Sequence, residues 1–154
     1  GTRVVTVSWA PDANATWDTH SGNFTKLKQT LLPQFDAACG ALLNDLDDRG
    51  MLERTMVAVL GDFGRTPKIN ANSAGRDHWN FCYSLMLAGG GVRAGLVYGA
   101  SDKIAAYPTK HPVSPSDFLA TIYHALGYGP NTRVVDPTGR PYFVVEGTPV
   151  HSLF

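Results

Sequence analysis

The fold predicted for this chain depends on one stretch, FTKLKQTLLPQFDAACGALLNDL, which runs from Phe24 to Leu46. Its apolar residues recur at the three- and four-residue spacing of one helix face. Pro33 interrupts the pattern, so the sequence predicts either a helix kinked there or two helices with Pro33 in the first turn of the second. Gly50 is suited to cap the end of this helix. The apolar face comprises Phe24, Leu27, Leu31, Phe35, Ala38, Cys39, Leu42, Leu43 and Leu46.

Two short apolar runs flank the helix. Arg3–Trp9 reads RVVTVSW and Thr55–Leu60 reads TMVAVL, and both are typical of buried strands. A strand, a helix and a strand form a βαβ unit, in which the two strands are parallel. Loops after parallel strands meet at one edge of the sheet, so we expect Asp18 and His20 to meet Asp62 there. The sequence therefore predicts an α/β fold.

Further elements are expected toward the carboxyl end. Phe81–Leu87 is a third predicted strand, followed by three glycines. Ser114 has the context of a helix cap, with proline next and an acid three residues later, and Gly127 would end that helix. Residues 136–139 read DPTG, a turn signal, and a short strand is expected over residues 142–145. These last residues predict a closing hairpin or sheet edge.

Composition indicates one globular domain over residues 1–154. The chain is 44% apolar and 17% charged, and 13 basic residues balance 13 acidic residues. This balance does not favour the phosphate contacts that hold proteins on nucleic acid, so no nucleic-acid partner is expected. No apolar run approaches the roughly 20 residues that cross a membrane, so we expect a soluble chain without a membrane partner. The chain lacks an initiating Met and starts with a strand-like run, which indicates part of a longer protein.

Three loops carry the residues that suggest chemistry. Residues 17–20 read WDTH, residues 61–67 read GDFGRTP and residues 75–79 read GRDHW. They supply three carboxylates and two imidazoles, a ligand set suited to Zn, Mn, Mg or Ca. The predicted metal ligands are Asp18, His20, Asp62, Asp77 and His78. The alternative is that the acids cap turns and the histidines are ordinary polar loop residues.

Arginines and the other histidines complete the candidates. A guanidinium matches phosphate or sulfate oxygens, and Arg65 is favoured over Arg76 for a catalytic contact with substrate because it lies near Asp62 in the sequence. Either arginine could instead form a surface ion pair. Structural or solvent-facing roles are expected for His111, His124 and His151, and inert thiols for Cys39 and Cys82.

The chain resembles the DUF1501 family. The resemblance rests on the three motifs above, on LAGGGV at residues 87–92 and on the run from Pro115 to Gly127, and it covers almost the whole chain. DUF1501 is a largely uncharacterised bacterial family related to sulfatases and alkaline phosphatases. The resemblance implies a three-layer α/β/α sandwich with a mainly parallel sheet, of which residues 1–154 are the carboxyl-terminal part. It also implies an exported, periplasmic or extracellular protein.

The resemblance further implies a two-metal hydrolase of phosphate or sulfate esters. Asp18, His20 and His78 look like the ligands of one metal ion, and Asp62 resembles a ligand of the other, with Phe63 where a histidine usually follows. Superfamily members carry a Ser, Thr or modified Cys nucleophile near the start of the domain. No residue of this chain matches it, so the chain alone is expected to be inactive.

Two rival functions stay open. One is a noncatalytic module in which the same loops bind a carbohydrate or a structural cation. The other is an inactive proteolytic fragment whose exposed apolar sheet edge would lead to homodimers or aggregates. An upstream strand ending in Asp, followed by a nucleophile, would favour the enzyme over both.

Overall fold

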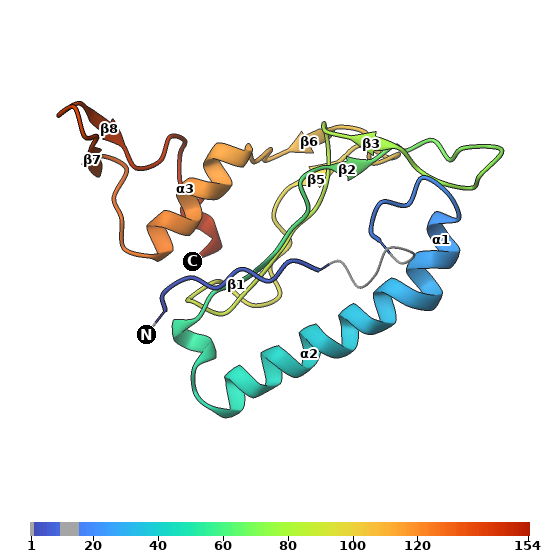
Figure 1. Ribbon diagram of the computed structural model, residues 1–154, viewed down its shortest axis with the longest axis horizontal. Coiled ribbons are helices and arrows are strands. Elements are labelled where there is room, and N and C mark those ends of the chain that lie inside the picture. Colours follow the sequence, from blue (N-terminus) through green and yellow to red (C-terminus); the bar gives the residue numbers. More distant parts are fainter. Residues whose placement is uncertain (1, 10–15) are drawn as a thin grey trace.

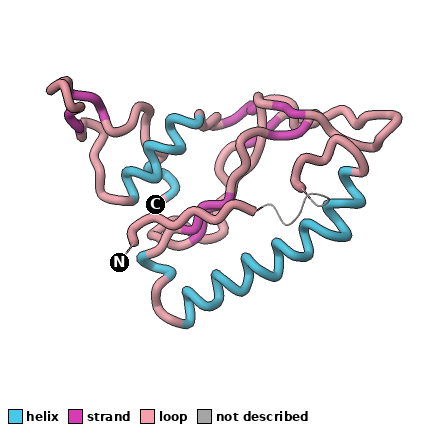
Figure 2. Tube along the Cα trace, in the orientation of Figure 1, coloured by secondary structure: helices cyan, strands magenta, loops and turns pink. Residues whose placement is uncertain are grey.

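The computed structural model describes residues 2–9 and 16–154, and Figure 1 shows their arrangement. Much of the chain is loop, with helices and short strands between the loops (Figure 2). The helices are α1 (Asn23–Lys26), a π-helical turn (Leu27–Leu31), α2 (Leu32–Asp48), a 3-10 turn (Leu52–Arg54), α3 (Pro115–Ala125) and a 3-10 turn (His151–Leu153). The strands are β1 (Val57–Val59), β2 (Gly64–Arg65), β3 (His78–Trp79), β4 (Met86–Ala88), β5 (Ala100–Ser101), β6 (Pro108–Lys110), β7 (Arg133–Val135) and β8 (Pro141–Phe143).

The predicted long helix is present as one continuous rod from α1 through α2 (Figure 1). Pro33 lies in the first turn of α2, as predicted, but α2 directly continues the preceding helical turns and is not a separate helix. Proline has no backbone N–H and its ring crowds the preceding turn of an ordinary α-helix. The π-helical turn before Pro33 widens the backbone there, so the two helical segments join without a break.

Gly50 ends α2 as predicted. Its φ is 61°, its N–H donates to Asp47 O over 2.8 Å, and Met51 N–H donates to Leu46 O over 2.8 Å. These two bonds form the Schellman arrangement that favours glycine after a helix. Local sequence therefore determines where this helix stops.

The predicted three-layer α/β/α sandwich with a mainly parallel sheet is wrong for this chain. The described strands form four two-stranded antiparallel pairs, β1 with β4, β2 with β3, β5 with β6 and β7 with β8. None of these strands is longer than three residues. Two antiparallel strands can be joined by a short turn. Two parallel strands need a long crossover connection, usually a helix, and a second strand beside the first.

The missing parallel partner is the run at the start of the chain. Arg3–Trp9 was predicted to be a strand, but its described residues form none. Val4, Val5 and Val7 are 65%, 76% and 78% exposed. A β-branched run becomes a strand only when a neighbouring backbone accepts and donates its hydrogen bonds, and no described segment does so here. Without it the βαβ unit does not form.

The carboxyl-terminal helix and hairpin are confirmed, whereas the strand predicted over Phe81–Leu87 is present only from Met86 onward, as β4. Ser114 caps α3 through a capping box with Asp117, and Gly127 follows its end with a φ of 88°. β7 and β8 form the expected hairpin. The Asp136 carboxylate accepts hydrogen bonds from the backbone N–H of Arg140 and the hydroxyl of Thr138, which lower its pKa to about 2. A local network thus holds the turn.

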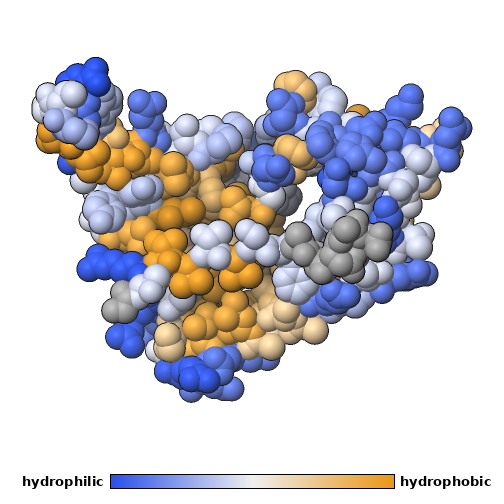
Figure 3. Space-filling view, viewed as in Figure 1, coloured by the Kyte–Doolittle hydropathy of each residue, from blue (hydrophilic) through white to orange (hydrophobic). Residues whose placement is uncertain are grey.

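The packed interior is small. The buried apolar side chains of the described residues are Leu31, Leu46, Ala106, Phe118 and Ala120. Figure 3 shows a broad hydrophobic area on the viewed face, so many apolar side chains are not covered. Among the helices that the structure describes, none combines the length and the apolar character needed to cross a membrane.

Candidate metal centre

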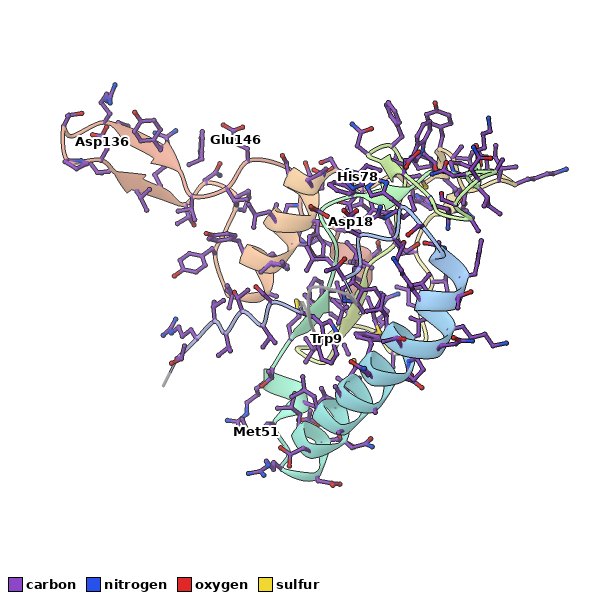
Figure 4. All side chains as sticks on the ribbon, turned by 45° about the vertical axis from the view of Figure 1, so that its right-hand side comes forward. Trp9, Asp18, Met51, His78, Asp136 and Glu146 are labelled. Atoms are coloured by element: carbon purple, nitrogen blue, oxygen red, sulfur yellow. The ribbon has the colours of Figure 1, made fainter. Side chains whose placement is uncertain are left out.

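Three predicted ligands converge at one point of the surface. Asp18 and His20 lie in the loop before α1, and His78 lies in β3. Asp18 Oδ1 is 3.0 Å from His20 Nε2 and 2.9 Å from His78 Nε2, and the two Nε2 atoms are 3.1 Å apart. Figure 4 shows Asp18 and His78 side by side. We call these three residues the Asp18 cluster.

Pairing of β2 with β3 brings the sequence motifs together. Arg65 lies opposite His78 in the pair, and the Thr66 N–H donates to Asp77 O over 2.8 Å. The Arg76 guanidinium donates to the carbonyl oxygens of Thr66 and Arg65 over 2.7 and 3.1 Å. Arg76, which directly precedes Asp77 and β3, therefore stabilises the contact between β2 and β3. This role explains the arginine in the GRDHW motif.

Arg65 holds the Asp18 carboxylate. Its guanidinium donates to Asp18 Oδ1 over 2.8 Å, to Trp17 O over 3.0 Å and to Arg76 O over 3.2 Å, and its side chain is 19% exposed. The hydrogen bond from His78 and then that from Arg65 lower the pKa of Asp18 to about 2. Asp18 is therefore a carboxylate at neutral pH. These three bonds use three of the five guanidinium N–H groups.

Asp77 orients His20. Asp77 Oδ1 lies 2.7 Å from His20 Nδ1, and Asn70 Nδ2 donates to the same oxygen over 3.1 Å. The bonds from His20 and then Asn70 lower the pKa of Asp77. A carboxylate only accepts, so the bond requires a proton on His20 Nδ1. In the neutral ring the lone pair is then on Nε2, which faces Asp18 and His78.

The three facing atoms of the cluster all lie within 4.8 Å of one another, so one cation could contact them all. A neutral His20 directs an Nε2 lone pair at the negatively charged Asp18 oxygen across 3.0 Å. His78 carries one proton when neutral and can offer its Nε2–H to only one of these two atoms well. A cation among the three atoms would satisfy all of them at once. Two imidazoles and one carboxylate are ligands that transition metals accept.

Phe63 packs against the cluster. Its ring lies 4.1 Å from the His78 ring at an interplanar angle of 37°, and the Arg65 guanidinium lies 6.0 Å from its centroid. The His20 and His78 rings are 4.7 Å apart. The aromatic contact limits rotation of His78, so Phe63 contributes packing at the position where the resemblance expected a histidine ligand.

Asp62 lies outside the group of converging atoms. Its side chain is exposed and its Oδ1 accepts the Phe63 N–H over 3.1 Å. The predicted meeting of loops after parallel strands depended on the βαβ unit, which the described residues do not form. Ligation by Asp62 stays a prediction.

Sequence reasoning missed the supporting roles of Asn70, Phe63 and Thr66. Thr66 Oγ1 accepts the Asp77 N–H over 3.1 Å and donates to Lys68 O over 2.9 Å, so it helps to place Asp77. The sequence indicated only that all three lie near the predicted ligands, within residues 61–79. Nothing in the spacing of these residues identifies which of them contacts an acid or an imidazole.

The remaining histidines lie apart from the Asp18 cluster. His111 stacks on Tyr98 with centroids 5.2 Å apart. His124 packs edge-on against His151 at 4.6 Å and against Phe154 at 5.6 Å. Within the described parts of the chain, the only group of three metal-binding side chains is the Asp18 cluster. Cys39 and Cys82 are free and partly exposed.

Comparison with known proteins identifies the family. The family model described as a protein of unknown function (DUF1501) matches residues 1–154. No curated protein matches the chain, and no solved structure matches it. The family match covers every motif from which the site is built. The chain therefore belongs to the DUF1501 family.

Proposed function

We propose that Asp18, His20 and His78 bind one divalent transition-metal ion, and that this ion serves a hydrolase acting on phosphate or sulfate esters. The convergence of Asp18 Oδ1, His20 Nε2 and His78 Nε2 at 2.9 to 3.1 Å carries the proposal. Two imidazole nitrogens favour zinc over manganese, calcium and magnesium, which prefer oxygen ligands.

The spacing fits such an ion with little movement. Tetrahedral bonds of about 2.0 to 2.1 Å place neighbouring ligand atoms about 3.3 Å apart. The three side chains would therefore separate by only a few tenths of an ångström. Three protein ligands also leave a position open for water or substrate, as in catalytic zinc sites.

The residues around the cluster have the roles that a metal site needs. Asp77 accepts from His20 Nδ1, which leaves Nε2 free to bind an ion and holds the ring in place. Arg65 holds Asp18 and adds positive charge beside the site. When bound, the ion would polarise an ester oxygen and lower the pKa of a water molecule. Arg65 therefore positions Asp18, and we also propose a catalytic role in which its two remaining N–H groups contact the ester.

Metal titration tests the first half of the proposal. We expect chelator-treated protein to bind about one equivalent of Zn²⁺ in competition with a chromophoric chelator, and the His78→Ala variant to lose this binding. His111→Ala is the matched control, because His111 stacks on Tyr98 away from the cluster. Equal binding by wild type and His78→Ala would show that zinc binds elsewhere.

Hydrolysis is tested separately. The ester class rests on the relation of the family to sulfatases and alkaline phosphatases. Aryl phosphate and aryl sulfate should be offered to the zinc-loaded protein, both as this chain and with any segments that its gene adds. Turnover that requires zinc and His78 is the expected result. Zinc binding without turnover of either ester in both forms would contradict the hydrolase.

A noncatalytic cation-binding module is the second candidate, and one observation favours it. Three hydroxyls of the segments that carry the cluster donate hydrogen bonds within the protein. Thr19 Oγ1 donates to Asn23, Thr66 Oγ1 to Lys68 O, and Ser73 Oγ to His20 O. A hydroxyl nucleophile from this chain would have to break such a bond. Zinc binding without hydrolysis is the result that this candidate predicts.

A further inference from the structure

We propose that Gly75 is a positioning residue for the metal centre, because its lack of a side chain lets the loop of residues 73–76 lie directly on the backbone of His20. This inference rests on the proposed metal site and concerns what sets its geometry. The loop of residues 73–76 leads directly into Asp77 and His78. Its distance from His20 therefore sets the distance between ligands that come from two separate parts of the chain.

The contact leaves no room for a side chain. A Cβ built on Gly75 would lie 1.8 Å from the carbonyl oxygen of His20, 2.0 Å from its carbonyl carbon and 2.5 Å from the backbone nitrogen of Ser21. All three are backbone atoms, so no flexible side chain can move aside. An alanine at position 75 has to push the two segments apart.

Backbone conformation does not explain this glycine. The left-handed residue of the loop is Ala74, with a φ of 50°, whereas Gly75 lies outside the positive-φ region. Glycine adopts a positive φ at little cost and alanine does not. If conformational freedom decided the sequence, the glycine would be expected at position 74. Its place at 75 is explained by the close approach to His20.

Hydrogen bonds on both sides of Gly75 prevent the segments from separating easily. Arg76 N–H donates to Thr19 O over 3.1 Å, and Ser73 Oγ donates to His20 O over 2.9 Å. Gly22 N–H donates to Ser73 O over 2.7 Å. Thr19 itself is 1% exposed, so the His20 segment has little freedom to shift. An added methyl group would act against this network and displace His78 and Asp77 relative to His20.

Moving the glycine from position 75 to position 74 tests whether the close contact with His20 or the flexibility of glycine is what matters. The variants are Gly75→Ala, Ala74→Gly, and the double variant Ala74→Gly/Gly75→Ala, which keeps one glycine in the loop. Gly40→Ala is the matched control, since a Cβ there meets nothing within 4 Å. Zn²⁺ affinity is measured by chelator competition, and the Co²⁺ absorption spectrum reports ligand geometry.

We expect Gly75→Ala and the double variant to bind Zn²⁺ at least about tenfold more weakly than wild type, with an altered Co²⁺ spectrum. Ala74→Gly and Gly40→Ala should stay within about twofold of wild type, because neither adds an atom near His20. Wild-type affinity and spectrum in the double variant would overturn the inference, even if its melting temperature fell. Absence of zinc binding by wild type would instead overturn the metal site itself.

Ser73→Ala keeps the test valid if Gly75→Ala does not fold, as judged by circular dichroism. It removes the hydrogen bond to His20 O and adds no atoms. A loss of Zn²⁺ affinity of roughly two- to tenfold is expected. Unchanged affinity and an unchanged Co²⁺ spectrum in Ser73→Ala would contradict positioning of His20 by this loop.

Discussion

Replacement of Asp77 tests how the centre is organised. Asp77 Oδ1 lies 2.7 Å from His20 Nδ1, the short distance of a charge-assisted hydrogen bond. Asp77→Asn keeps a carbonyl oxygen that can accept from His20 but removes the charge. Asp77→Ala removes the acceptor as well, so the ring can rotate and exchange tautomers. Loss of such a supporting partner typically weakens metal binding by about 10- to 100-fold. We expect Asp77→Asn near the lower end of that range and Asp77→Ala near the upper end.

The assay is competition between the protein and a chromophoric zinc chelator at neutral pH. There Asp77 is ionised, because the hydrogen bonds from His20 and then Asn70 lower its pKa. Asp36→Asn, which removes an exposed carboxylate on α2, controls for the change in net charge. If both Asp77 variants bind zinc within about twofold of wild type while His78→Ala does not bind, orientation of His20 by Asp77 is refuted.

Three further predictions concern stability, and urea denaturation measures the first two. Leu31→Ala should cost about 2 to 5 kcal/mol because Leu31 is fully buried, whereas Phe24→Ala, at a side chain 53% exposed, should cost less than about 1 kcal/mol; equal losses would contradict the assigned core. Ser114→Ala should lower the free energy of unfolding by about 1 kcal/mol, because it removes the cap of α3. Ser116→Ala, at the second residue of α3, should lower it by less than about 0.5 kcal/mol, and the reverse order would argue against the cap. The pKa of Asp136 falls from 3.8 to about 2 on folding, so its stabilisation is complete above pH 4 and is lost as the pH falls toward 2. The melting temperature of Asp136→Asn should therefore lie further below that of wild type at pH 7 than at pH 2, and an equal difference at both pH values would contradict this assignment.

Local features were predictable because their hydrogen bonds are local. The helix from residue 23 to residue 48, its glycine stop at Gly50, and the capping box at Ser114 each depend on residues within a few positions of one another. The π-helical turn was not predicted. Pro33 showed that an ordinary helix would be disturbed, but sequence alone does not say how the backbone accommodates the ring.

Strand pairing could not be predicted in the same way. The run over residues 3–9 has the composition of a strand, but a strand also needs a partner in space. β1 pairs instead with β4, antiparallel and some 30 residues later, with Val57 opposite Ala88. Composition cannot choose between these partners, because backbone hydrogen-bonding groups are the same in every residue except proline.

The sequence by itself determined which side chains are available for chemistry, since Asp18, His20 and His78 already have the composition of a metal site. The tertiary structure decided which of the five predicted ligands meet. It brings these three together, gives Asp77 the place beside His20 Nδ1, and leaves Asp62 outside the group. The reason is that the two halves of the cluster are separated by some 60 residues. The packing of residues 73–76 on the His20 backbone, the pairing of β2 with β3 and the bonds from Arg65 to the Asp18 loop bring the two halves together.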